Sequence, residues 1–198
     1  MADSVVVPGS RDVRASLDAG SADRCVVACP PHPQFGGSRS DRRLRAVGEA
    51  LADREIACLR FDYGPWDNGY GELDDAMSAV DYATERFDRV GLFGYSFGGT
   101  IALLAAARNG VACVSALAPG GRLADDLDPV DALDAISIPV QVVHGERDTT
   151  VDWQPVVERA DERGFVVQSM GADHHFVGQQ AKIAEHVADF QATHLATE

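Results

Sequence analysis

The chain has 198 residues, 17 of them basic and 31 acidic, and 17 − 31 gives a formal net charge of −14 at pH 7. This length predicts one domain over residues 1–198, and a hydrophobic content of 45% is enough for a substantial core. The charge argues against nucleic acid or an anionic membrane as the main partner. The longest apolar run, Ile101–Ala107, is too short for a transmembrane helix, and no secretory signal is visible. We therefore expect a cytoplasmic protein.

Short apolar segments alternate with longer amphipathic or alanine-rich segments along the chain. Several of the short segments are continuously apolar and rich in β-branched residues, which is typical of strands buried on both faces of a parallel sheet. The predicted strands are Ser4–Val7, Val13–Leu17, Cys25–Cys29, Ile56–Phe61, Val90–Phe93, Cys113–Leu117, Val140–His144 and Phe165–Ser169. The predicted helices are Ser40–Arg54, Leu73–Phe87, Phe97–Arg108, Val151–Arg163 and Gly178–Thr193, with a further short helix expected within Gly120–Ile136.

This alternation of strands and helices predicts an α/β fold with a mainly parallel central sheet and helices on both faces. The helix expected at Leu73–Phe87 supports this arrangement, because its small apolar side chains fall on one stripe: Ala76, Ala79, Val80 and Ala83. In the helix expected at Val151–Arg163, the carboxylate of Asp152 would act as the N-cap. In such folds the loops after the carboxyl ends of the strands form the functional site.

Two features of composition bear on environment. Lys182 is the single lysine, the other 16 basic residues are arginines, and 22 aspartates outnumber 9 glutamates. This composition resembles that of cytosolic proteins from salt-accumulating halophiles, which we favour over an acidic mesophilic protein. The four cysteines all lie in apolar segments without zinc or redox spacing, so we expect buried free thiols and no metal: Cys25, Cys29, Cys58 and Cys113.

The clearest chemical motif is the G-x-S-x-G sequence at Gly94–Gly98, which lies between a predicted strand and a predicted helix. In this setting the motif indicates a nucleophile elbow, in which Ser96 occupies a strained turn and its small neighbours allow strand and helix to approach closely. A serine nucleophile needs a base, and the base needs an orienting group. The ends of two later strands carry a candidate for each.

Asp148 follows the predicted strand Val140–His144, and His174 follows the predicted strand Phe165–Ser169. The chain order of serine, aspartate and histidine is the one expected of an α/β-hydrolase, so we predict a catalytic triad of Ser96, Asp148 and His174. His175 is an alternative base. Asp173 is expected to shape the turn rather than to replace Asp148.

The sequence resembles the small α/β-hydrolases without a lid that are related to dienelactone hydrolase, over nearly the whole chain. The resemblance rests on four segments: Pro31–Gly37, Gly94–Gly98, His144–Asp148 and Gly171–His174. This chain has Pro30-Pro31-His32-Pro33 where relatives usually have His-Pro-His-Pro, and the loop 62–72 where they tend to have Arg-Gly-x-Gly-x-Ser. Dienelactone hydrolase itself uses a cysteine nucleophile, so Ser96 points to a serine esterase or a related hydrolase.

The expected reaction is cleavage of a small ester, lactone or thioester through an acyl-enzyme on Ser96, with no cofactor and a small molecule as substrate. The oxyanion should be held by the backbone N–H of Phe97 and by a second N–H from the loop after Cys25–Cys29. The prolines in that loop have no N–H, which leaves His32, Gln34 or Phe35 as the second donor. We favour His32, with Gln34 next.

Two other functions are compatible with the sequence. An amidase or peptidase would use the same triad chemistry. A non-catalytic protein with a hydrolase-like fold could bind a small ligand or a partner, since fold alone does not establish activity. Among the remaining histidines, we expect His144 to be structural and His186 and His194 to be solvated. Three aromatic side chains could line the pocket or pack beside it: Trp66, Tyr70 and Trp153.

Overall fold

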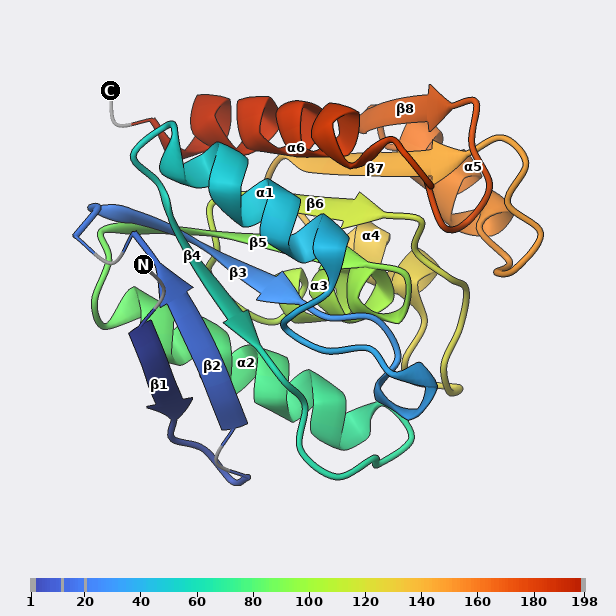
Figure 1. The fold of residues 1–198 in the computed structure, drawn as a ribbon. Helices are drawn as coiled ribbons and strands as arrows, with labels where there is room; N and C mark the ends of the chain where they lie inside the picture. Colours follow the sequence, from blue (N-terminus) through green and yellow to red (C-terminus); the bar gives the residue numbers. More distant parts are fainter. Residues whose placement is uncertain (1–2, 12, 20, 197–198) are drawn as a thin grey trace.

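The fold is a single eight-stranded sheet with helices on both faces (Figure 1). The computed structural model describes residues 3–11, 13–19 and 21–196. The strands are β1 (Asp3–Val7), β2 (Val13–Asp18), β3 (Arg24–Cys29), β4 (Ala57–Phe61), β5 (Arg89–Tyr95), β6 (Val114–Leu117), β7 (Val140–Gly145) and β8 (Val166–Met170). The helices are α1 (Arg42–Ala52), α2 (Tyr70–Thr84), α3 (Phe97–Ala106), α4 (Pro129–Ala135), α5 (Gln154–Glu162) and α6 (Gln180–Leu195), and a 3-10 turn, η1, covers Pro33–Phe35.

The strand order is β1-β2-β4-β3-β5-β6-β7-β8. Strand β1 pairs antiparallel with β2, and β2 pairs antiparallel with β4. Every other neighbouring pair is parallel, so strands β3 to β8 form a continuous parallel sheet and their carboxyl ends meet at one edge. The predicted α/β-hydrolase fold with a mainly parallel sheet is therefore confirmed.

The sheet separates two layers of core. Helices α1 and α6 pack together on one face, where Leu44, Leu51 and Val187 are fully buried against the strands. Helices α2 to α5 cover the other face, and the apolar stripe predicted for α2 is buried there. The central strands β3, β4 and β5 are buried almost throughout, because helices cover both of their faces. Within the described residues, no helix is both long and apolar enough to cross a bilayer.

Four predicted helix starts differ from the structure, those of α1 and α6 by two residues and those of α2 and α5 by three. Helix α2 begins at Tyr70 rather than at Leu73, since the buried Glu72 carboxylate accepts hydrogen bonds from the N–H groups of Asp67 and Gly69 and so caps an earlier turn. The prediction that Asp152 caps α5 is wrong. Trp153 is the N-cap residue instead, without a side-chain cap, because its indole is held by contacts described below.

Candidate active site

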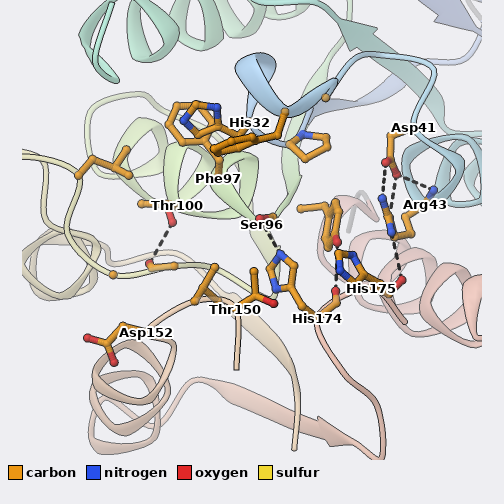
Figure 2. A pocket seen from close by; sticks show the side chains of 18 of the residues that line it. His32, Asp41, Arg43, Ser96, Phe97, Thr100, Thr150, Asp152, His174 and His175 are labelled. Atoms are coloured by element: carbon orange, nitrogen blue, oxygen red, sulfur yellow. Dashed lines mark hydrogen bonds and ion pairs between the residues drawn. The ribbon is translucent and has the colours of Figure 1, made fainter. Parts of the chain in front are cut away.

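Three loops at the carboxyl edge of the sheet bring the predicted triad together, and Figure 2 shows two of its members, Ser96 and His174. Ser96 follows β5, Asp148 follows β7 and His174 follows β8. The strands β5 to β8 are consecutive neighbours in the sheet, so the loops after them converge although the residues are far apart in the chain. Each side chain thus reaches the site from the end of a different parallel strand.

Ser96 occupies a strained turn between β5 and α3. Its backbone has φ 56° and ψ −122°, a conformation with positive φ that is costly for a residue with a side chain. The turn is possible because Gly94 and Gly98 lack side chains: a Cβ on Gly94 would lie 1.9 Å from the carbonyl oxygen of Gly98, and one on Gly98 would lie 2.2 Å from that of Cys29. This is the nucleophile-elbow geometry that the motif predicts.

A continuous line of hydrogen bonds joins the three side chains. The Nε2 atom of His174 lies 2.9 Å from the Oγ of Ser96, and its Nδ1 lies 2.7 Å from the Oδ2 of Asp148. An ionised carboxylate can only accept a hydrogen bond, so Nδ1 carries the proton of a neutral imidazole and Nε2 is left to accept from the serine hydroxyl. The arrangement places a base on the serine and an orienting acid on the base.

Asp148 is fixed from several directions. Its side chain is fully buried, and its Oδ1 accepts hydrogen bonds from the N–H groups of Thr150 at 2.9 Å and Val151 at 3.4 Å. Its backbone carbonyl accepts a 3.0 Å hydrogen bond from the Trp153 indole, whose ring stacks on His144 at a centroid distance of 4.4 Å. These contacts hold the carboxylate in one orientation toward the imidazole. The Asp148-x-Thr150 spacing is typical of an Asx turn and could have been recognised in the sequence.

The loop that carries His174 is held by Tyr95 and Arg43, neither of which the sequence singles out. The Tyr95 hydroxyl donates a 3.0 Å hydrogen bond to the backbone carbonyl of His174, and burial raises the pKa of Tyr95 to about 12, so the hydroxyl keeps its proton. Arg43 lies 4.0 Å from the Tyr95 ring centre, donates to the carbonyl of His175 and is paired with Asp41. The loop is therefore attached to both α1 and β5.

The triad opens into a pocket of about 960 Å³. Loop 31–37, the loop after β6 around Gly120 to Leu123, and the Asp148 loop supply most of its wall. Figure 2 shows Ser96 and His174 between the Asp41 and Arg43 side and the Thr100 and Asp152 side. The nucleophile is thus reachable by a small molecule.

The loop after β3 brings His32 to the pocket wall beside Phe97, with the two rings 4.9 Å apart. The N–H of Gln34 donates to the Nδ1 of His32 at 3.3 Å, and the N–H of Phe35 donates to the His32 carbonyl at 3.1 Å. Among the described residues, none accepts a hydrogen bond from the N–H of His32. Burial lowers the pKa of His32, although the nearby Glu72 opposes the shift, so its ring stays neutral and able to accept from Gln34.

The structure also places the other candidates. His175 is exposed and its ring lies 5.6 Å from that of His174, which is the histidine hydrogen-bonded to Ser96. Asp173 accepts a hydrogen bond from the N–H of His175 and so shapes the turn. Asp152, which does not cap α5, lies exposed at the pocket wall.

The three aromatic side chains left open by the sequence do not line the pocket. Trp66 lies against His32 at a ring distance of 4.4 Å, Trp153 against His144 as described, and the Tyr70 hydroxyl donates to Asp126. His144 is buried, as a structural residue would be, whereas His186 and His194 are only partly exposed.

The cysteines are buried and free, and burial raises the pKa of the Cys58 and Cys113 thiols to about 12. Within the described ranges, no group of three or more His, Cys, Asp or Glu side chains could hold a metal ion. The thiols therefore pack as small apolar groups in this part of the chain.

Fold and site together define the class of protein as an α/β-hydrolase without a lid, and solved structures of that class are similar over almost their whole length. An α/β serine hydrolase without a lid from Xanthomonas campestris shares 20% identity, with 100% of this chain and 96% of that chain covered and a TM-score of 0.83. The esterase Pf2001 of Pyrococcus furiosus shares 18% identity over 99% and 92% of the two chains, also with a TM-score of 0.83. Est1E from Butyrivibrio proteoclasticus, solved with bound ferulic acid, shares 20% identity over 98% and 100%, with a TM-score of 0.83.

The family model of the dienelactone hydrolase family matches residues 66–197. The chain belongs to this family and is an α/β-hydrolase enzyme, as the sequence resemblance implied. An uncharacterized protein of Rickettsia prowazekii, RP471, is 25% identical, with 82% of this chain and 76% of that protein covered.

Proposed function

We propose that this hydrolase cleaves a small carboxylic ester, lactone or thioester through a covalent acyl-enzyme on Ser96. The observation that carries the proposal is the hydrogen-bonded line from Asp148 through His174 to Ser96 at the floor of an open pocket. The triad supplies the nucleophile, the base and the orienting acid, so this reaction requires no cofactor.

In the first half-reaction, the Oγ of Ser96 forms a bond to the carbonyl carbon while its proton moves to the Nε2 of His174. The Asp148 carboxylate stabilises the imidazolium that results. His174 then returns the proton to the oxygen or sulfur of the leaving group as the bond to the acyl carbon breaks. The leaving group departs as a neutral alcohol or thiol, and the acyl group remains on Ser96.

In the second half-reaction, water replaces the leaving group. His174 removes a proton from water as its oxygen attacks the acyl carbon, and the same proton is transferred to the Oγ of Ser96 when the acid leaves. The enzyme is thereby returned to its starting protonation state. The 2.9 Å contact between Nε2 and Oγ suits both transfers.

The negative oxygen formed in each half-reaction needs two hydrogen-bond donors. We assign the N–H of Phe97, which opens helix α3, and the N–H of His32. Two observations support His32 over its alternatives: the N–H groups of Gln34 and Phe35 are both engaged within η1, whereas that of His32 is not used by another described residue. The amino end of α3 adds a favourable dipole near the developing charge.

An amidase or peptidase with the same triad remains the second candidate, because acyl transfer from amides uses the same steps. The esterases among the similar structures favour the ester. We also propose a cytoplasmic location, since the four buried cysteines are all free, as expected in a reducing compartment.

The direct test is the rate of p-nitrophenyl acetate hydrolysis by Ser96→Ala. Removing the nucleophile should lower kcat by 10³-fold or more, because the remaining groups act as a unit with it. Ser169→Ala is the matched control, since this exposed serine on β8 lies outside the pocket and should leave the rate unchanged. Equal rates for Ser96→Ala and the parent enzyme would refute the proposal and favour a binding protein.

A further inference from the structure

An exposed phenylalanine lies at the wall of the active-site pocket. Phe35 is 87% exposed, more than any other large apolar side chain of the described residues. The other exposed large apolar side chains do not line the pocket: Val6, Tyr70, Val166 and Val177. Phe35 thus combines a large free apolar surface with a place in the wall of the pocket that also contains Ser96.

The backbone of Phe35 is fixed even though its ring is exposed. The residue ends η1, and its N–H donates to the His32 carbonyl. The turn continues through Gly36, with φ 80°, and Gly37, where a Cβ would lie 2.1 Å from the carbonyl oxygen of Pro31. Only glycine fits that approach, so the turn fixes the point on the pocket wall from which the phenyl ring projects.

The ring of Phe35 is the outer end of a continuous series of aromatic contacts. Its ring centre lies 4.8 Å from that of His32, which in turn lies 4.4 Å from Trp66 and 4.9 Å from Phe97. Phe97 contacts Tyr63 edge-on at 5.6 Å. These separations are those of favourable aromatic pairs, and within the described chain His32 is the one ring in contact with Phe35.

We propose that Phe35 and the ring of His32 form a subsite that binds an aromatic ring of the ester substrate. The inference rests on the proposed function and specifies its substrate class. An aryl group attached near the scissile bond would continue the aromatic series and cover the free surface of Phe35. Apolar area removed from water and the ring–ring contact would then both favour aryl esters over small alkyl esters.

The polar groups of the pocket are consistent with a neutral ring as occupant. Arg43 is paired with Asp41, and Arg122 with Asp128 at 2.7 Å, so both cations at the wall are already neutralised. Asp152 has no ion-pair or hydrogen-bond partner for its carboxylate within the described chain, which disfavours an anionic substrate. An uncharged aryl ester needs no free cation in the pocket and is not repelled by the Asp152 carboxylate.

The test compares esters that differ in one ring, with acid release followed by titration at constant pH. Ethyl acetate carries no ring, benzyl acetate has a ring on the alcohol side and ethyl phenylacetate has one on the acyl side, while cyclohexylmethyl acetate carries a saturated ring. Phe35→Ala removes the proposed contact, and Phe35→Tyr retains it. Val6→Ala removes another exposed apolar group, on β1 and away from the pocket.

We expect the parent enzyme to prefer at least one of the two aryl esters over ethyl acetate about tenfold or more in kcat/KM, a preference not matched by cyclohexylmethyl acetate. Phe35→Ala should reduce the preference at least fivefold, mainly through KM, whereas Phe35→Tyr and Val6→Ala should keep it. An unchanged preference in Phe35→Ala, no aryl preference in the parent, or an equal gain with the saturated ring would each overturn the subsite. Failure of the parent to cleave any of these esters in a Ser96-dependent manner would instead overturn the proposed function.

Discussion

Ser96 acquires its position at the pocket from neighbours that have no chemical role in the reaction. The positive φ of Ser96 is tolerated because Gly94 and Gly98 allow β5, α3 and the end of β3 to approach within contact distance. Side chains at either glycine would force these backbones apart and move the hydroxyl relative to His174. The motif is therefore a packing requirement as much as a chemical one.

His144 couples the stability of the Asp148 loop to pH. It is buried against the Trp153 ring, and burial lowers its pKa below 6.5, with smaller opposing contributions from the Gly145 backbone, Glu146 and Asp148. Below about 6.5 the unfolded chain takes up the proton that the folded protein resists. Stability should accordingly be greatest above this pH and fall as the pH drops toward the lowered pKa.

We predict that His144→Phe reduces the acid sensitivity of folding while keeping the stacked ring. The difference in melting temperature between pH 5 and pH 7.5 should shrink by a few degrees relative to the parent protein. His186→Asn, at a partly exposed histidine of α6, is the control and should leave the difference unchanged. A pH dependence that is the same in His144→Phe as in the parent would contradict this role.

The loop 62–69, where the sequence departs from the pattern of its relatives, is held by an arginine distant in the chain. Arg11, between β1 and β2, donates its Nε to the Oδ1 of Asp75 at 3.1 Å, and its guanidinium also contacts the Pro65 carbonyl. Asp75 and Glu72 are almost fully buried. The loop carries Trp66, which packs on His32. A series of contacts therefore joins Arg11, in the turn between β1 and β2, to the pocket wall.

Arg11→Ala should destabilise the protein by about 3–5 kcal/mol, because it leaves the buried Asp75 carboxylate with the N–H of Gly64 but without a positive charge. For a chain of this size the melting temperature should fall by about 10 °C. Arg86→Ala is the control, since Arg86 and Glu85 form an exposed pair that should contribute less than about 1 kcal/mol. A loss for Arg11→Ala no larger than for Arg86→Ala, measured by urea unfolding, would show that this contact is dispensable.

Local sequence patterns predicted most of the strands and helices. The features that they did not predict depend on contacts between segments distant in the chain. The apolar runs located the strands, and the stripe on α2 located its buried face, because each depends on neighbouring residues. The pairing of Arg11 with Asp75 and of Trp66 with His32 joins separate loops, and no local pattern reveals it. The error at Asp152 has the same origin, since the start of α5 is determined by the contact of Trp153 with His144 and Asp148.

We propose that residues 1–198 fold as one domain. The net charge of −14 acts on this whole molecule, and we propose that it reflects adaptation to high salt. At low ionic strength the acidic side chains repel one another and oppose compaction. Repulsion is screened as the Debye length falls from about 10 Å at 0.1 M to about 3 Å at 1 M salt.

We predict that the melting temperature rises as KCl increases from 0.1 to 2 M. A variant with four exposed carboxylates neutralised, Asp74→Asn, Glu158→Gln, Asp161→Asn and Glu185→Gln, should show a weaker rise, because its net charge would be −14 + 4 = −10. Calorimetry of both proteins across the salt series gives the comparison. A flat or falling melting temperature in the parent protein would contradict adaptation to salt.

The assignment of Ser96 as the nucleophile supports every later step, and covalent labelling tests it most directly. Treatment with a fluorophosphonate, followed by mass spectrometry of the intact protein and its peptides, should give one adduct, located on Ser96. The adduct should be absent in Ser96→Ala, and it should form far more slowly in His174→Asn than in His175→Asn, since His174 is the base that contacts the hydroxyl. An adduct on another residue, or labelling of Ser96→Ala at the parent rate, would contradict the account.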